Sequence, residues 1–146
     1  MALSGFSAAA ATVNYTLKGV IDTGALTGLS FSGTFGFDDS LLSSNPDWLP
    51  LSSISVDFNG QTYALAGANP DATVSFDAGS VLGVDVTWGD DTQGLFLSTG
   101  FGDPRLGDPD GNAGSYTVTA ATVPEPSTWL LGLAGLAVMG AVMRRR

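Results

Sequence analysis

The chain contains no cysteine and no histidine, and these absences narrow its chemistry. Without cysteine it can form neither disulfides nor thiolate metal sites. Without histidine it lacks the commonest general base and the commonest ligand of transition metals. Lys18 is the only cation before residue 105, so a serine nucleophile would have almost no base to activate it. The sequence therefore predicts a protein that is not an enzyme.

Glutamate and basic residues are also scarce. Thirteen of the 14 acidic residues are aspartate, and Glu125 is the one glutamate. Before residue 124, only Lys18 and Arg105 oppose these thirteen aspartates, which leaves a net charge of −11. Such an acidic surface repels phosphate backbones, which argues against nucleic-acid binding. Aspartate and the 20 glycines are typical of turns, whereas glutamate favours helices, so the composition predicts strands joined by many turns.

Residues 12–122 show the two-residue alternation of half-buried strands. The clearest run places these residues on one face: Leu29, Phe31, Gly33, Phe35 and Phe37. No stretch before residue 127 has convincing helical spacing. About seven to nine strands in about 110 residues predict an all-β fold, a single antiparallel β-sandwich or jelly-roll-like domain.

Turn residues divide this domain. Asn59 and Gly60 both tolerate a positive φ and lie between two apolar runs, which predicts a tight hairpin. The segments 40–50 and 100–114 are rich in Asp, Pro, Gly, Asn or Ser, so we expect both to be loops.

The segment 108–112 places oxygen-bearing side chains two residues apart, as in the first half of a calcium loop. It departs from the EF-hand pattern, because Ala113 replaces the required glycine and Thr119 replaces the final glutamate. An irregular Ca²⁺ site is the candidate, and a solvated acidic turn is the alternative. The candidate ligands are Asp103, Asp108, Asp110 and Asn112.

The two ends of the chain differ from its body. Residues 1–11 finish in four alanines, small residues typical of a signal-peptide cleavage site, although no basic region precedes them. We interpret them as a signal-peptide remnant or, alternatively, as a flexible N-terminus. At the other end, the uncharged apolar run from Thr128 to Met143 would span about 24 Å as a helix, close to the ~30 Å hydrocarbon core.

This run predicts a C-terminal transmembrane helix, with the terminal arginines cytoplasmic and the body outside. A buried helix of a soluble domain is the alternative, which the flanking prolines and arginines oppose. The residues expected to hold this helix in the bilayer are Trp129, Leu130, Leu131, Leu133, Leu136, Val138, Arg144, Arg145 and Arg146.

Residues 123–146 combine the sequence Val-Pro-Glu-Pro-Ser, the short apolar run and the arginine cluster in an order that resembles the PEP-CTERM sorting signal. The resemblance implies an exported bacterial protein that an exosortase, a membrane transpeptidase-like enzyme, recognises at Pro124, Glu125 and Pro126. It also implies that the helix is removed during sorting, in species that often make exopolysaccharide and biofilm. The two prolines disfavour helix and keep the segment extended. The alternative is a proline-rich linker to a permanent anchor.

We therefore predict an exported, non-enzymatic protein of the cell envelope, cell surface or extracellular matrix, whose precursor is a single-pass membrane protein. Exosortase, the lipid bilayer and exopolysaccharide are the expected partners, and no cofactor is expected apart from the candidate Ca²⁺. The alternative is a carbohydrate-binding module or adhesin, in which Trp48, Tyr63 and Trp88 are the aromatic candidates. A hydrolase that pairs Asp90 with Asp91 is disfavoured, because adjacent side chains at a strand end point in different directions.

Overall fold

The computed structural model describes residues 11–89, 94–100 and 102–122. These residues form ten strands and two short 3₁₀ helices, η1 and η2, and every strand pairing is antiparallel. The elements in chain order are β1 (Thr12–Thr23), β2 (Ser30–Asp38), η1 (Asp39–Ser44), β3 (Trp48–Pro50), β4 (Ser53–Phe58), β5 (Gln61–Ala64), η2 (Leu65–Gly67), β6 (Thr73–Asp77), β7 (Ser80–Trp88), β8 (Leu95–Ser98), β9 (Arg105–Gly107) and β10 (Ala113–Ala120).

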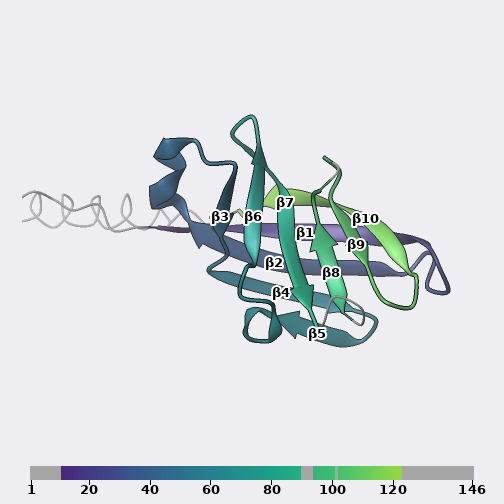
Figure 1. Ribbon diagram of the computed structural model, residues 1–146. Coiled ribbons are helices and arrows are strands. Elements are labelled where there is room, and N and C mark those ends of the chain that lie inside the picture. The colour runs from purple at the N-terminus through teal and green to yellow at the C-terminus, as the bar shows by residue number, and fades with distance from the viewer. Residues whose placement is uncertain (1–10, 90–93, 101, 123–146) are drawn as a thin grey trace, which may run out of the picture.

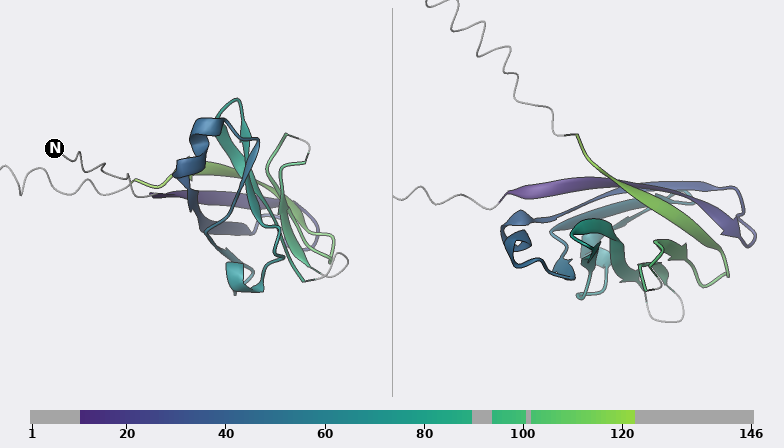
Figure 2. Two further views of the ribbon diagram at one scale, coloured as in Figure 1. Left: turned by 60° about the vertical axis from the view of Figure 1, so that its left-hand side comes forward. Right: turned by 90° about the horizontal axis from the view of Figure 1, so that it is seen from above.

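The ten strands form one hydrogen-bonded sheet in the order β3-β6-β7-β8-β9-β10-β1-β2-β4-β5. The sheet curls on itself, so that β3 and β6 to β9 lie across β10, β1, β2, β4 and β5 (Figures 1 and 2). The predicted all-β antiparallel class is confirmed. The predicted β-sandwich or jelly-roll-like domain is confirmed in its coarser form: the fold is sandwich-like, and its two layers belong to a single curled sheet.

The two layers join at β9, which pairs with β8 on one side and with β10 on the other. The Phe96 ring on β8 covers Gly107 on β9 so closely that a Cβ at Gly107 would lie 2.4 Å from it. Glycine therefore permits the tight packing at the place where the chain passes from one layer to the other.

The core lies between the layers and follows the alternation in the sequence. On β2, the rings of Phe31, Phe35 and Phe37 are buried as predicted, and Ser30, Ser32 and Thr34 of the opposite face are exposed, whereas Gly36 of that face is buried. Phe37 meets Phe76 of β6 edge to face, with ring centroids 5.5 Å apart, which joins the two layers. Burying each such side chain stabilises the fold by roughly 1.5–3 kcal/mol.

Tyr116 adds a polar connection between the layers. Its hydroxyl, on β10, accepts a hydrogen bond from the Val84 backbone N–H on β7 at 3.0 Å and donates one to the Val84 carbonyl at 3.2 Å. Burial raises the pKa of Tyr116 far above its ordinary value, so the hydroxyl stays neutral and continues to donate.

The prediction of turns was right at one place and wrong at two. Phe58 pairs with Gln61 across Asn59 and Gly60, whose φ values are 48° and 77°, so the tight hairpin is confirmed. The predicted loop 40–50 instead contains η1 and β3, and the predicted loop 100–114 contains β9 and the start of β10. β3 and β9 are three residues long, too short to show alternation, which is why the structure has more strands than we predicted.

The predicted ends of the chain fall largely outside the described residues. This applies to the signal-peptide remnant, except Ala11, and to the whole of 123–146 with its transmembrane helix. Among the residues that the structure does describe, no helix combines the length and the apolar character needed to cross a bilayer.

Candidate functional site

The described part of the chain ends at residue 122, at one end of the molecule, which we call the tail end. There β10 finishes, and the Ala121 N–H donates to the Asn14 carbonyl at 2.8 Å. At the same end β1 begins, and Ala11 is bonded to Asp39 both through the Asp39 N–H (3.1 Å) and through the Asp39 carboxylate (3.2 Å). η1 therefore lies beside the start of β1 (Figure 2).

Exposed apolar side chains are concentrated in the η1–β3 segment. Leu41 is 51% exposed and Leu42 is 38% exposed, and we call these two residues the tail-end patch. Trp48, 61% exposed, follows on β3. The η1 backbone is closed by hydrogen bonds at both of its ends. The Asp38 carboxylate accepts from the Ser40 N–H at 2.8 Å, and Asn45, with φ 50°, donates its N–H to the Leu42 carbonyl.

Aspartates surround this patch. Asp38 and Asp39 begin η1, and Asp47 precedes β3. Hydrogen bonds from the Ser40 backbone and side chain lower the pKa of Asp38, so this carboxylate is ionised at neutral pH. The tail end thus presents two leucines among negative charges.

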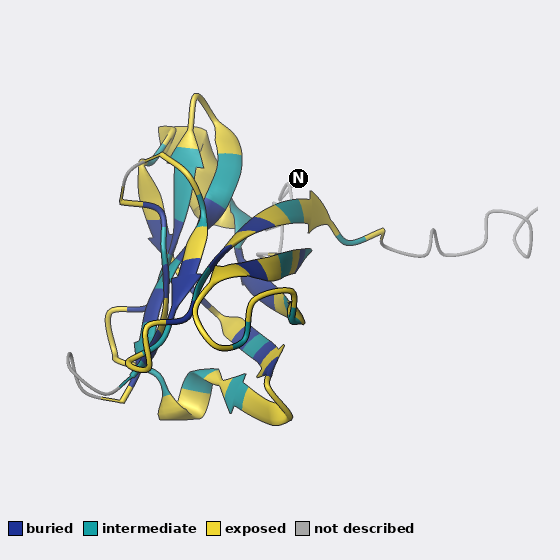
Figure 3. Cartoon of the chain, turned by 90° about the vertical axis from the view of Figure 1, so that its right-hand side faces the viewer, coloured by how far each residue is buried: buried dark blue, intermediate teal, exposed yellow. Residues whose placement is uncertain are grey.

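The opposite end, which we call the far end, holds the turns after β1, β4 and β9. A cleft of about 520 Å³ lies there, between the β4–β5 hairpin, the end of β7 and the turn before β10. Figure 3 faces this end and shows buried residues on the strands and exposed residues on most of the turns. The polar residues that line the cleft are Asn59, Gln61, Thr62, Tyr63, Asp108 and Asp110.

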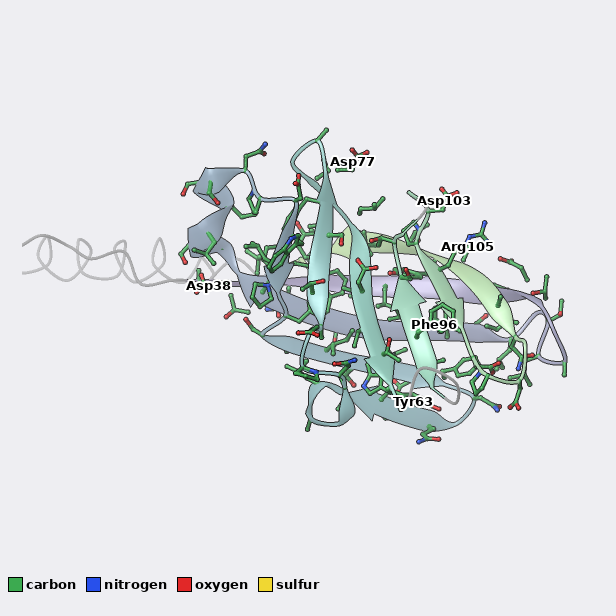
Figure 4. All side chains as sticks on the ribbon, viewed as in Figure 1. Asp38, Tyr63, Asp77, Phe96, Asp103 and Arg105 are labelled. Atoms are coloured by element: carbon green, nitrogen blue, oxygen red, sulfur yellow. The ribbon has the colours of Figure 1, made fainter. Side chains whose placement is uncertain are left out.

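The structure separates the three aromatic candidates. Trp88 is buried at 5% exposure, and its Nε1–H donates to the Ala64 carbonyl at 2.8 Å. Tyr63 is half-buried in the cleft, with its ring centroid 5.6 Å from that of Trp88 (Figure 4). Trp48 belongs to the tail-end segment. Only Tyr63 is therefore both accessible and part of the cleft.

Comparison with known proteins identifies the segment that follows the fold. Residues 122–146 match the family model of the PEP-CTERM protein-sorting motif. The chain carries a PEP-CTERM sorting motif. This motif marks an exported protein of the cell surface or extracellular space that an exosortase sorts. No curated protein and no solved structure matches the chain.

The PEP-CTERM match includes all the residues that we predicted for sorting and anchoring. The recognised residues Pro124, Glu125 and Pro126, the apolar anchor and the arginine cluster all lie within 122–146. They lie outside the described residues, as do Asp90 and Asp91. The structure does place Thr122, the first residue of the match, directly after the hydrogen-bonded Ala121.

The four candidate Ca²⁺ ligands of the PEP-CTERM protein are used differently in the structure. The Asp108 carboxylate accepts from the backbone N–H groups of Asp110 (3.0 Å) and Asn112 (2.9 Å), and from the Asn112 amide (2.8 Å). Asn112 is buried, and the oxygen of its side-chain amide accepts a hydrogen bond from the Leu26 N–H at 2.9 Å. These contacts, which we call the Asn112 clip, join the β9–β10 turn to the β1–β2 turn.

Asp103 stands apart from the clip. Asp103 precedes β9 (Figure 4) and Asp108 follows it, so this three-residue strand, about 10 Å long, lies between the two residues. Within the ranges that the structure describes, no three acidic side chains gather in a way that could hold a metal. The Ca²⁺ site stays a prediction; absence of heat and of any thermal shift with millimolar Ca²⁺ would contradict it.

Sequence reasoning missed two features. One is the tail-end patch, since two leucines within an Asp- and Ser-rich segment follow no periodic pattern.

The other is Asp85 on β7, whose carboxylate accepts hydrogen bonds from Ser75 Oγ (2.5 Å), Thr99 N–H (2.8 Å) and Thr99 Oγ1 (2.6 Å). Burial alone would raise the pKa of Asp85, but hydrogen bonds from Ser75, Thr99 and Ser98 outweigh it and lower the pKa. Asp85 thereby connects β6, β7 and the end of β8.

Proposed function

We propose that this protein is an exported, non-enzymatic component of the cell surface or the exopolysaccharide matrix, sorted by an exosortase through its PEP-CTERM motif. The apolar run holds the precursor in the bilayer as a single-pass protein until the tail is removed. The observation that carries the proposal is the motif match at 122–146, which begins where the folded domain ends.

The described residues support a role without catalysis. A general acid or base works best with a pKa near the operating pH. The Asp85 carboxylate accepts hydrogen bonds from Ser75 and Thr99, and its pKa is lowered, so it stays ionised and cannot donate a proton near neutral pH. The Tyr116 hydroxyl has a raised pKa and is engaged at both its donor and its acceptor positions. Both groups are suited to stabilising the fold.

Mass spectrometry of the mature C-terminus, in cells with and without an active exosortase, tests sorting. We expect loss of the tail only where the enzyme is active. A Pro124→Ala/Pro126→Ala variant keeps the apolar run and the arginines, so it controls for anchoring alone and should keep its tail. An uncut tail in the wild-type protein under both conditions would reduce the motif to a permanent anchor.

A second candidate function, a carbohydrate-binding module or adhesin, is favoured by the far-end cleft. Ligand sites are concave and combine aromatic surface with a few polar groups, as Tyr63 does with the neighbouring Asn59 and Gln61. The cleft also lies away from the tail, so sorting would leave it open. A glycan array followed by calorimetry on the full-length protein would test this function, and no bound glycan on the array would contradict it.

A further inference from the structure

The folded domain ends very close to the sorting motif. Ala121 is still hydrogen-bonded to β1, and Pro124 follows only three residues later. Three extended residues reach at most about 11 Å. An enzyme that holds residues 124–126 as an extended strand, one of the recurring ways to bind an unpaired segment, therefore works close to the tail end of the domain.

The tail-end patch lies at the same end of the domain, where β1 begins and where β2 and β10 finish. β2 leads into η1, and β2 lies two strand spacings, about 10 Å, from β10. Three of the five exposed large apolar side chains among the described residues, Leu41, Leu42 and Trp48, come from this one segment. The hydrogen bonds that close η1 hold both leucines in place, with the Leu41 carbonyl accepting from Ser44 Oγ at 2.7 Å and the Leu42 carbonyl from the Asn45 N–H at 3.0 Å.

We propose that Leu41 and Leu42 form a docking surface for the sorting enzyme, which contacts the folded domain there while it holds the motif. This inference rests on the proposed sorting by an exosortase. It adds that recognition extends beyond the motif into the β domain.

Charge favours a protein partner over the bilayer as the occupant of this surface. Asp38, Asp39 and Asp47 flank the two leucines, and the segment between residues 38 and 50 contains no lysine or arginine. Membrane surfaces rich in anionic lipids attract basic segments and repel acidic ones. A protein can instead place an apolar groove against the leucines and basic side chains against the aspartates.

The test measures tail removal by pulse–chase in cells that contain an active exosortase, using the full-length chain. A Leu41→Ser/Leu42→Ser variant should be processed at least fivefold more slowly than the wild type. Val20→Ser, which changes an exposed apolar residue (43% exposed) at the other end of β1, is the control and should be processed at the wild-type rate. Equal rates for all three proteins would overturn the docking surface. A wild-type protein that is never cut would instead overturn the proposed function.

Photo-crosslinking identifies the occupant. A photoreactive residue replacing Leu41 should give an adduct with the exosortase, whereas the same residue replacing Val20 should give none. Adducts to lipid alone from position 41 would overturn the proposal and assign this surface to the bilayer. Thermal unfolding of each variant confirms that the domain is folded, which separates slow processing from misfolding.

Discussion

The two ends of this β domain differ in which side chains their loops bury and which they expose. At the far end, polar groups face inward and bond to one another, as Asn112 does with Asp108 and Leu26. At the tail end, apolar groups face outward, and Leu41 and Leu42 contribute little to the core. Buried polar groups that satisfy each other stabilise a fold, whereas exposed apolar groups are available to a partner. The comparison predicts that the far end contributes more to stability, and that the tail end can change with little cost to the fold.

The largest effect on stability should come from breaking the far end. Asn112→Ala removes the side-chain amide that joins the two turns. The Leu26 N–H and one Asp108 oxygen then lose their hydrogen bonds to it. We expect the free energy of unfolding to fall by about 3 kcal/mol, since each buried group left without a partner costs about 1–3 kcal/mol. Urea unfolding of the full-length protein measures the change.

Asp110→Ala is the matched control at the same turn, because the exposed Asp110 contributes only its backbone N–H to the clip. Its effect should stay within about 0.5 kcal/mol. Equal losses for the two variants would show that the turn sequence, and not the clip, stabilises the far end.

Between the two ends, Asp85 should give the domain its sensitivity to acid. Asp85→Ala leaves the buried Thr99 N–H unpaired and should destabilise by about 2 kcal/mol at pH 7. The pKa of Asp85 is lower in the folded protein than its usual 3.8, so its stabilisation is complete above that value and is lost as the pH falls through the folded pKa. Unfolding curves from pH 7 to 2 should therefore show the two proteins converging at the acid end of the range.

The exposed Asp71→Ala is the matched control, and its free energy of unfolding at pH 7 should stay within about 0.5 kcal/mol of the wild-type value. A difference between wild type and Asp85→Ala that persists undiminished below pH 3 would mean that the carboxylate acts through packing and not through its charge.

Ligand affinity is a third property in which substitutions at the two ends should differ. If the cleft binds a saccharide, Tyr63→Ala should weaken its affinity about tenfold, equivalent to about 1.4 kcal/mol, by removing the half-buried ring. Trp48→Ala removes a larger and more exposed ring at the tail end and should leave the affinity unchanged. Isothermal titration with a glycan found on the array measures both, and the reverse ranking would move the ligand site to the tail end.

The smallest effect on stability should come from the tail-end patch itself. Leu41→Ser/Leu42→Ser should change the free energy of unfolding by only about 0.5 kcal/mol, as expected for surface substitutions. Leu49→Ala, in the same segment but only 5% exposed, should cost about 3 kcal/mol, because it opens a cavity in the core. Comparable losses from the two changes would show that the patch is part of the core.

The sequence predicted local structure better than pairing. The alternation on β2 and the hairpin at Asn59-Gly60 depend on neighbouring residues, and both were confirmed. The curled sheet depends on β9, whose three residues join β8 to β10 and carry no pattern of their own. Long-range pairing of so short a strand follows from the surrounding packing, which a single sequence does not display.

The candidate sites divide in the same way. The PEP-CTERM motif could be recognised because its order is local in the chain. The burial of Trp88 could also have been foreseen, since it lies on the same face of β7 as Val84 and Val86. The Asn112 clip and the Asp85 contacts join residues from different turns and strands, so they appear only once the chain is folded.

The position of β10 has a mechanical consequence. This strand leads to the tail and is bonded to β1 along most of its length, from Ala113 to Ala120. Antiparallel hydrogen bonds lie perpendicular to the strands, so a pull between the tail and the far end runs along β10 and loads the whole ladder in shear. The bonds then share the force and do not open one after another. A domain attached through this strand therefore resists tension applied between the tail and the far end.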